Sequence, residues 1–356
     1  MAVRTPKEIK DFSEMYIDPE VSIAELCDLF GLASGSIYRR GFELGLTRPK
    51  GAKATLNLAQ IREYVQALMH DLPAIATKPM STHKLTTKPG DVILILGDLH
   101  AGRLTSSTNT EVLGRRVEAL GLRVADTVQR QGLTGCKLSV FIVGDLVTGE
   151  RVGGQVSLEE LEHTVLEQCF NIAMPYLTRM LTYFTTVFST VDVYSVAGNH
   201  GPVSKPALST GANWDNVVML GLQAMMSKFK QVTFNIATVD FYNFATVGGI
   251  DWLLVHGDQM RGGNAVGSLG KVMNDWHRSM TQHFDLMALG HFHEINKVRD
   301  AYMTGCFVTD DEWSREVVKR EGDCAQLLLT VGKGKVQAIC PIYLDDIKAG
   351  QGTDDD

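Results

Sequence analysis

The stretch Val-Ile-Leu-Ile-Leu-Gly-Asp-Leu-His-Ala-Gly, residues 92–102, decides the fold. Its first five residues are apolar and rich in Val, Ile and Leu, which predicts a buried β-strand. The run stops at Gly97, and Asp98 and His100 follow at once. Asp and His are ligands that divalent metal ions prefer, and a glycine beside them lets the backbone approach closely. The stretch therefore predicts a metal site at the end of a buried strand.

The same arrangement occurs four more times along the chain. The further blocks are Gly144-Asp145, Gly198-Asn199-His200, His256-Gly257-Asp258 and Gly290-His291-Phe292-His293. On an extended strand end, the spacing of Asp98 and His100 would turn both side chains to one face, where one ion could bind both. His291 and His293 repeat that spacing. Every block lies at the end of an apolar run, where loops can come together. The five blocks together therefore predict a hydrolase with two metal ions.

From Asp91 onward, strands alternate with helices, and we expect an α/β sandwich of two packed sheets flanked by helices. The expected strands are 92–96, 139–143, 191–196, 252–255, 285–289, 295–302, 326–331 and 335–342. The expected helices are 109–130, 158–183, 214–229 and 268–283, the second of them either continuous or broken at Pro175.

The chain before this domain has a different pattern. Residues 22–31 predict a capped helix that ends at a glycine, and residues 37–44 predict a second helix after a short turn. This spacing is typical of a helix-turn-helix. We therefore divide the chain into a small all-α module (1–56), a linker with one helix near 56–69 (57–90), a catalytic domain (91–345) and an acidic tail (346–356).

The N-terminal pattern resembles the small helix-turn-helix modules of phage and bacterial DNA-binding proteins. The resemblance implies that DNA is contacted by Ser34, Ser36, Tyr38, Arg39 and Arg40. The alternative is a two-helix cap whose basic residues are only solvated.

Composition limits the class of protein. The chain of 356 residues is 44% hydrophobic and 21% charged, as in ordinary soluble globular proteins. It has no apolar run of the roughly 20 residues that span a bilayer, and its six scattered cysteines predict free thiols. We expect a cytoplasmic protein with no membrane partner. Residues 91–356 hold 22 Lys and Arg against 31 Asp and Glu, so this domain does not attract a polyanion by its overall field.

The five blocks resemble the calcineurin-like metallophosphoesterases, whose pattern is Asp-x-His, Gly-Asp, Gly-Asn-His, His and Gly-His-x-His. All five are present in that order across residues 93–293. The resemblance implies two divalent ions, which we expect to be Mn²⁺, with Fe²⁺ or Zn²⁺ as alternatives. It implies a first ion bound by Asp98, His100, Asp145 and His293. It implies a second ion bound by Asp145, Asn199, His256 and His291.

In the same resemblance, His200 is no ligand but the acid that protonates the leaving oxygen or stabilises charge. The Ser/Thr phosphoprotein phosphatases of the family carry Gly-Asp-x-x-Asp-Arg-Gly, and here Thr148 replaces the Asp that would support this histidine. Gly201 also stands where Asp or Glu is frequent. Arginines that bind substrate must then come from elsewhere, and the candidates are Arg103, Arg151 and Arg261. Solvated loop charge is their alternative explanation.

The block Leu-Gly-Asp-Leu-His-Ala-Gly is more similar to the SbcD-type repair exonucleases and to phage-encoded phosphoesterases. We therefore expect a two-metal phosphodiesterase that acts on DNA, an exonuclease or endonuclease of phage or bacterial origin. The alternative is a protein phosphatase, a small-molecule phosphatase or a cyclic-nucleotide phosphodiesterase whose N-terminal module serves assembly, as in a homo-oligomer. A DNA-binding regulator with a degenerate enzyme domain is a third class, and the complete ligand set argues against it.

Overall fold

The computed structural model describes residues 6–18, 21, 23–30, 37, 44, 46, 90–150, 160–203, 211–260, 269–310 and 322–348. The chain divides into two compact units, Met1–Pro73 and Ala74–Asp356. None of the helices in these described ranges is long and apolar enough to cross a membrane. The five cysteines whose environment is described are free thiols, and all but Cys340 are buried.

The first unit has a small core of its own. Its described helices are α1 (Pro6–Ile17) and α2 (Ile23–Phe30). The core joins Phe12, Tyr16, Leu26 and Ile37. Helix α2 lies inside the helix expected at residues 22–31, whereas α1 had no counterpart among the expected helices. Apart from Ile37 and Leu44, the second helix of the expected helix-turn-helix lies outside the described residues, as do its five DNA-contact candidates and the linker helix.

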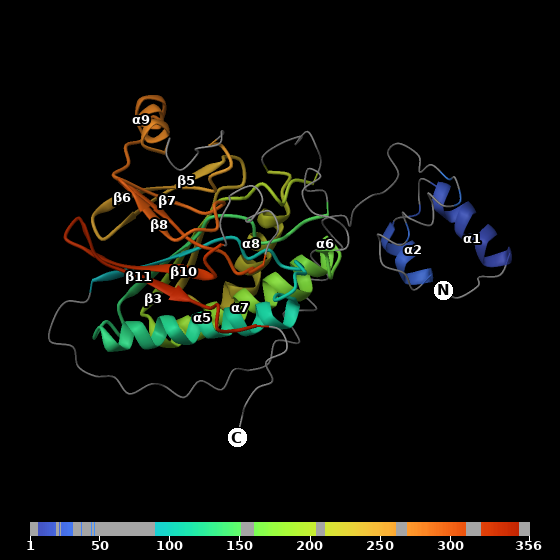
Figure 1. Ribbon diagram of the computed structural model, residues 1–356, viewed down its shortest axis with the longest axis horizontal. Helices are drawn as coiled ribbons and strands as arrows, with labels where there is room; N and C mark the ends of the chain where they lie inside the picture. Colours follow the sequence, from blue (N-terminus) through green and yellow to red (C-terminus); the bar gives the residue numbers. More distant parts are fainter. Residues whose placement is uncertain are drawn as a thin grey trace, which may run out of the picture. The chain divides into compact units, whose positions relative to one another are not determined.

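The second unit is built on two mixed sheets (Figure 1). The six-stranded sheet has the order β11 (Lys335–Tyr343), β10 (Ala325–Gly332), β1 (Asp91–Leu96), β2 (Lys137–Ile142), β3 (Thr190–Ser195) and β4 (Val232–Ile236). Strands β1 to β4 are parallel neighbours, and β10 pairs with β1 in the antiparallel direction.

The five-stranded sheet has the order β5 (Tyr242–Val247), β6 (Ile250–Val255), β7 (Leu286–Leu289), β9 (Ala301–Met303) and β8 (Asn296–Val298). Strands β6, β7 and β9 are parallel, and the two outer strands are antiparallel to their neighbours. The expected strand at 295–302 is thus two short strands, because the chain turns back at Arg299, whose φ is 53°.

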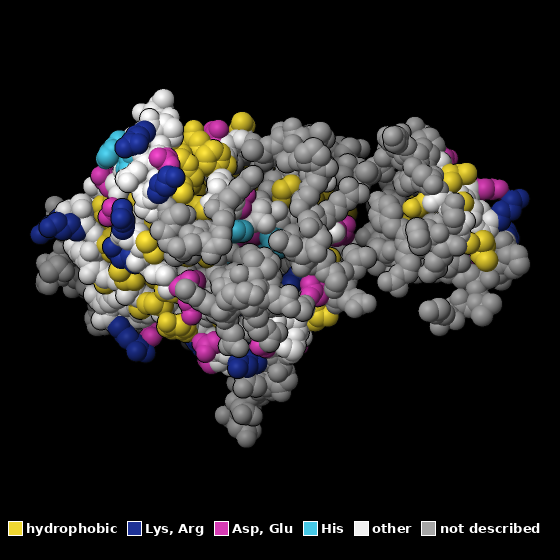
Figure 2. Space-filling view, turned by 45° about the horizontal axis from the view of Figure 1, so that its top comes forward, with side chains coloured by type: hydrophobic (Ala, Val, Ile, Leu, Met, Phe, Trp, Pro, Cys, Tyr) yellow, Lys and Arg dark blue, Asp and Glu magenta, His cyan; other side chains and the backbone are white. Residues whose placement is uncertain are grey.

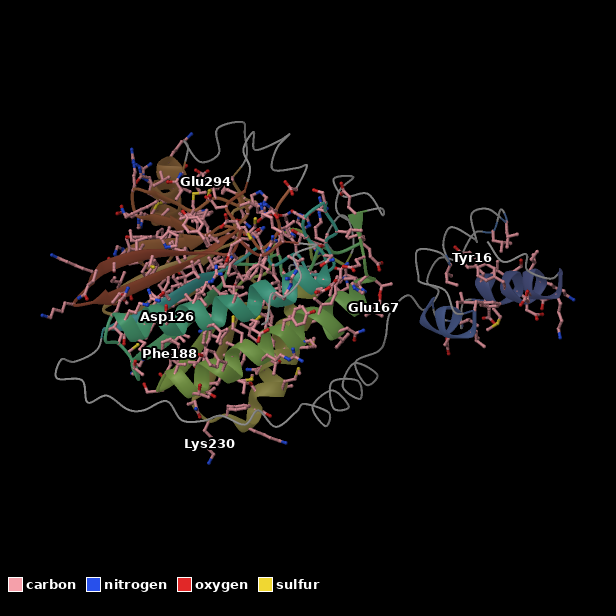
Figure 3. The ribbon with its side chains drawn as sticks, turned by 60° about the horizontal axis from the view of Figure 1, so that its bottom comes forward. Tyr16, Asp126, Glu167, Phe188, Lys230 and Glu294 are labelled. Carbon is pink, nitrogen blue, oxygen red and sulfur yellow. The ribbon has the colours of Figure 1, made fainter. Side chains whose placement is uncertain are left out.

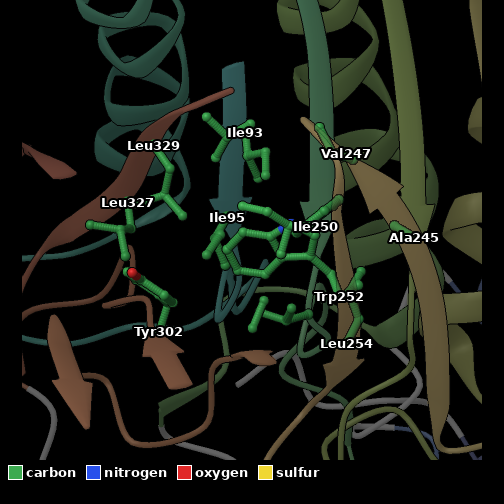
Figure 4. Close-up of a cluster of buried hydrophobic side chains, with 14 of the residues drawn as sticks. Ile93, Ile95, Ala245, Val247, Ile250, Trp252, Leu254, Tyr302, Leu327 and Leu329 are labelled. Atoms are coloured by element: carbon green, nitrogen blue, oxygen red, sulfur yellow. The ribbon is translucent and has the colours of Figure 1, made fainter. Parts of the chain in front are cut away.

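The two sheets pack face to face around one apolar layer (Figure 4). Trp252 of β6 lies fully buried in this layer, together with Ile93 and Ile95 of β1 and Leu327 and Leu329 of β10. Figures 1 and 3 show helices α5 (Thr110–Arg130), α7 (Met174–Val187) and α8 (Trp214–Met225) along the outer face of the six-stranded sheet. Helix α9 (Leu269–Ser279) packs on the outer face of the other sheet. The expected α/β sandwich is confirmed.

The topology explains why the five sequence blocks meet. Each block follows directly on the carboxyl end of β1, β2, β3, β6 or β7. The first three strands are parallel neighbours, so their carboxyl ends lie at one edge of their sheet, and the same holds for β6 and β7. Because the sheets pack face to face, both edges bring their loops to one place.

Some details differ from the expectations. The edge strands β4 and β5 were not expected, because their side chains alternate between more and less exposed and form no apolar run. The expected helix at 158–183 begins only at Val165, where Thr164 and Glu167 form a capping box. It passes through a π-helix, Gln168–Ala173, into α7, whose first turn accommodates Pro175. The expected tail begins with residues bound to the domain, since Arg123 pairs with Asp346 at 2.6 Å.

The layer between the sheets gives a stability prediction. Replacing the buried Trp252 by Ala leaves a cavity that Ile93 and Leu254 cannot fill without moving the strands. We expect a loss of about 3–5 kcal/mol in the free energy of unfolding, measured by urea denaturation. Leu220→Ala, at a side chain that is 49% exposed, is the control and should cost less than ~1 kcal/mol. Equal losses in both variants would contradict the described core.

Candidate metal centre

The ligand-bearing loops have an unusual backbone. Of the eight described non-glycine residues with positive φ, five are candidate ligands. They are Asp98 (53°), His100 (47°), Asp145 (53°), His291 (70°) and His293 (54°). This left-handed region is costly for residues with a Cβ and clusters at functional sites. The expectation that Asp98 and His100 share a face of an extended strand is therefore wrong, because β1 ends at Leu96 and left-handed turns aim both side chains.

Hydrogen bonds between loops hold this backbone in place. The amide of Asp98 donates to Gly144 O at 3.1 Å, and the amide of His100 donates to Asp145 O at 3.0 Å. These two bonds join the loop after β1 to the loop after β2. The amide of His291 donates to the Asp98 carboxylate at 3.0 Å, which joins the two sheets. The ligand positions are thus fixed by contacts between different strands.

Two glycines are required by close approach. A Cβ on Gly198 would collide with the carboxylate and amide of Asp145, and a Cβ on Gly290 would collide with the carboxylate of Asp98. Both glycines directly precede ligand candidates in the sequence. Their role is the one expected from the sequence, since only a residue without a side chain lets these loops touch.

The first cluster joins Asp98, His100 and His293, all buried. The two Nε2 atoms of His100 and His293 lie 3.1 Å apart, and Asp98 Oδ1 lies 3.4 Å from His293 Nε2. Two imidazole nitrogens that share one ion at about 2.1 Å lie about 3.0–3.4 Å apart for ordinary coordination angles. The donor set and its spacing therefore fit a divalent ion.

The second cluster joins Asp145, His256 and His291. His256 Nε2 lies 3.0 Å from Asp145 Oδ2 and 2.9 Å from Asn199 Oδ1. Its Nδ1 lies 2.7 Å from Val143 O, and because a carbonyl only accepts, Nδ1 carries a proton and Nε2 faces the centre. Asp145 also groups with His100 and His200, so its carboxylate lies between the two clusters.

The electrostatic surroundings of these groups set their protonation in the absence of an ion. Burial, then the charge of His200, lower the pKa of His100 well below its usual value, so this ring is neutral at pH 7. Although burial opposes it, His256 and His200 hold the pKa of Asp145 well below its usual range. Burial likewise disfavours charge on His256, but the carboxylate of Asp145 outweighs it and raises the pKa of His256 to about 10. In the absence of an ion, a proton on His256 therefore balances Asp145.

His200 lies beside both clusters with a partner of its own. Its Nδ1 is 3.2 Å from Thr148 O, and its Nε2 is 3.9 Å from Asp145 Oδ2. Its amide donates to Asp145 Oδ1 at 2.8 Å. The side chain is 17% exposed, more than those of His100, His256 and His293. A ring that is accessible and fixed at Nδ1 presents Nε2 to a substrate.

Asp215 is the most important residue whose role the sequence did not reveal. At the start of α8, its buried carboxylate accepts from the amides of Asp145 at 2.9 Å, Leu146 at 3.0 Å and Gly198 at 2.8 Å. Burial, then the charge of Asp145, raise its pKa to about 6. Asp215 thus fixes the two loops that carry Asp145 and Asn199. From the sequence, Asp215 was a residue that could line the site or equally cap a helix, and its bonds to two ligand loops were not predicted.

Two other buried side chains support the first cluster without a sequence signal. Gln326 of β10 accepts from the amide of Gly97 at 2.9 Å, directly before Asp98. Although burial opposes it, the thiol of Cys306 and the carboxylate of Asp98 raise the pKa of His293 well above its usual value. Both partners are distant in the sequence, so no local pattern indicates them.

The arginines expected to bind phosphate divide into two groups. Arg103 is near the centre, but it is buried and forms an ion pair with Glu160 at 3.2 Å. Arg151 and Arg261 lie outside the described residues, as do Ser34, Ser36, Tyr38, Arg39 and Arg40.

No protein-family model and no curated protein matches the chain. Among solved structures, it is similar to a predicted phosphoesterase from Streptococcus pneumoniae, at 9% identity over 73% of this chain and 92% of that one, with a TM-score of 0.31. It is similar to zinc-complexed Vps29 from Entamoeba histolytica, at 11% identity over 71% and 99%, with a TM-score of 0.31. It is also similar to the sulfate thiohydrolase SoxB from Thermus thermophilus, at 10% identity over 74% and 58%, with a TM-score of 0.34.

The role of Asp215 gives a prediction for Asp215→Asn. The NH₂ of Asn must replace one of the two carboxylate oxygens, so it would face either the amides of Asp145 and Gly198 or those of Leu146 and Val147, and a buried donor without an acceptor costs about 1–3 kcal/mol. We expect at least a tenfold lower kcat/KM and weaker binding of one of two ions, measured by steady-state kinetics and metal analysis. Asp192→Asn, at the carboxylate of β3 that bonds Thr233, is the control. Full activity with two bound ions in Asp215→Asn would contradict this role.

The pKa of His256 gives a pH prediction. Because this pKa is raised to about 10, the ring carries a proton at neutral pH, and an ion that binds Nε2 must displace it. The affinity for Zn²⁺ should therefore rise with pH between about pH 6 and pH 8, by up to about tenfold per unit for each proton released. Calorimetry in two buffers of different protonation enthalpy measures that release. An affinity that is independent of pH would contradict it.

Proposed function

We propose that the second unit is a two-metal phosphoric ester hydrolase that cleaves phosphodiester bonds. The observation that carries this proposal is the pair of buried ligand clusters on either side of Asp145, with one further histidine directed at them. When bound, two divalent ions would polarise a phosphoryl group and activate a water for in-line attack. The first ion would be held by Asp98, His100, Asp145 and His293. The second would be held by Asp145, Asn199, His256 and His291.

The protein's own contribution beyond these ligands comes from His200. Because Nδ1 donates to Thr148 O, the proton that His200 can give or take is the one at Nε2, beside the centre. Phosphodiester cleavage expels an alkoxide, which needs a proton or a nearby positive charge. His200 supplies it from a fixed ring at the edge of the clusters.

We propose DNA as the substrate and Mn²⁺ as the metal. Support for DNA comes from the first unit, a helical module with its own core, which includes Ile37 at the start of the second helix expected for the helix-turn-helix. The acidic balance of residues 91–356 does not favour DNA by itself. The module would therefore bring DNA to the catalytic unit, through Ser34, Ser36, Tyr38, Arg39 and Arg40.

A phosphatase for small substrates is the second candidate. The observation that favours it is the acidic balance of residues 91–356, with 22 Lys and Arg against 31 Asp and Glu, which suits a small substrate better than a polyanion.

The test is a substrate panel for the full chain with Mn²⁺: single- and double-stranded DNA, a cyclic nucleotide, bis(p-nitrophenyl) phosphate and p-nitrophenyl phosphate. We expect cleavage of DNA and of the synthetic diester. His200→Ala should lower DNA cleavage by about 10²–10⁴-fold, the usual contribution of a general acid. His277→Ala, at an exposed histidine of α9, is the matched control.

Turnover of the monoester without cleavage of DNA would overturn the nuclease and favour the second candidate. No hydrolysis with any divalent metal would overturn the hydrolase itself. A double variant, Arg39→Ala with Arg40→Ala, should lower DNA cleavage more than turnover of the synthetic diester.

A further inference from the structure

A fully buried glutamine near the centre takes no part in the steps above. Gln168 is the first residue of the π-helix Gln168–Ala173. Segments of this kind are rare, and those that occur often lie at functional sites. Its Oε1 accepts from the amide of Gly149 at 2.8 Å, and its Nε2 donates to His163 O at 2.9 Å. Both polar atoms of the amide are thus engaged, and one of them holds the loop that follows Asp145.

The bond to Gly149 acts on a particular peptide unit. The carbonyl of Thr148 and the N–H of Gly149 belong to one planar trans peptide, so they point in opposite directions. The N–H is held by Gln168, and the carbonyl accepts from Nδ1 of His200 at 3.2 Å. The direction in which Gln168 holds the N–H therefore sets the direction of the carbonyl that orients His200.

The remaining bonds of this segment leave that direction to Gln168. The amide of Thr148 donates to Ala101 O at 3.1 Å, and its hydroxyl donates to His100 O at 2.9 Å. Both bonds hold Thr148, the residue on the N-terminal side of the Thr148–Gly149 peptide. On the C-terminal side is Gly149, with a φ of 72°, a residue whose backbone turns easily. The next anchor is the side chain of Glu150, which accepts from the amide of Val165 at 2.9 Å. Without Gln168, the Thr148–Gly149 peptide could rotate while Thr148 stayed in place.

We propose that Gln168 is a positioning residue for His200: through this peptide it keeps the proton on Nδ1 and turns Nε2 towards the metal centre. The inference rests on the proposed role of His200 as the acid of a phosphodiesterase. It goes further in naming what sets the tautomer and the orientation of that acid. Asp215 holds the backbone of Asp145 and of Gly198, whereas the orientation of the His200 ring depends on Gln168.

The inference can be tested with two substrates, because loss of the acid slows a reaction only when the leaving group is poor. Bis(p-nitrophenyl) phosphate expels p-nitrophenolate, which needs little protonation, whereas a dinucleotide expels an alkoxide that needs it. In Gln168→Met, the bond to Gly149 is lost with little change in shape. We expect kcat for the dinucleotide to fall at least tenfold more than kcat for the synthetic diester, with Mn²⁺ saturating.

Two further variants separate positioning from a general loss of structure. Gln168→Glu should restore the wild-type ratio of the two rates, because a buried carboxyl favours its neutral form, which keeps the acceptor for Gly149 and a donor for His163 O. Gln326→Met is the matched control, since Gln326 is also fully buried and accepts from a glycine amide, that of Gly97. It supports Asp98 instead of the acid, so both rates should fall together.

A second measurement does not depend on activity. Two-bond ¹H–¹⁵N spectra of the histidine rings report which nitrogen of His200 carries the proton. In metal-free protein at a pH where the ring is neutral, we expect the Nδ1–H form in the wild type and a mixture of tautomers in Gln168→Met. Should Gln168→Met not fold, Gln168→Leu takes its place in both measurements.

The outcomes are distinct. A parallel fall of both rates in Gln168→Met, or an unchanged Nδ1–H signal, would overturn the inference while the hydrolase stands. A wild type that cleaves neither substrate would instead overturn the proposed function. A changed ratio that Gln168→Glu does not restore would also count against the inference, because the hydrogen bond to Gly149 would then not be the cause.

Discussion

The carboxylate of Asp145 is the contact on which the rest of the centre depends. Asp145 follows β2 of the six-stranded sheet, and His256 follows β6 of the other sheet. Nevertheless, Asp145 Oδ2 lies 3.0 Å from His256 Nε2. A buried carboxylate costs several kcal/mol unless it is compensated, and here the compensation comes from both sheets. The same histidine also donates from Nδ1 to Val143 O, two residues before Asp145. One buried ion pair therefore fixes how the sheets meet at the edge where all five loops end.

The strained backbone around this pair points to function. Residues in the left-handed region cost of order 1–3 kcal/mol each, and five candidate ligands share that region. Such a sum is large beside the roughly 5–15 kcal/mol by which a domain is stable. It persists because the amides of Asp98, His100 and His291 are each bound by another loop. The loops are thus held in a shape that places imidazole and carboxylate groups around shared points, and cations at those points would relieve the crowding of like groups.

Much of this arrangement follows from the sequence, for identifiable reasons. Apolar runs that end in glycine and a ligand predicted the strands and the edge where the ligands meet, because parallel strands share the direction of their ends. The sequence could not predict the left-handed turns at Asp98 and His100, which depend on bonds to another loop. It could not predict the hydrogen bond between Asp215 and the amide of Asp145 either, because the two residues are 70 positions apart. The roles of Gln168, Gln326 and Cys306 could not be predicted for the same reason. The edge strands β4 and β5 lack an apolar run, and the ion pair of Arg103 depends on how a distant segment folds back.

The two ends of the loop after β2 have different functions, and this distinguishes the centre from a simple metal cluster. One end of that loop presents Asp145 and is held by Asp215, and the other end presents the carbonyl of Thr148 and is held by Gln168. The roles given to Asp215 and Gln168 require that two ions occupy the clusters. Anomalous X-ray diffraction from crystals grown with Mn²⁺ tests this occupancy most directly. Two anomalous peaks should appear, one beside Asp98, His100 and His293 and one beside His256 and His291, with Asp145 between them. A single peak, or peaks away from these residues, would contradict a two-metal centre.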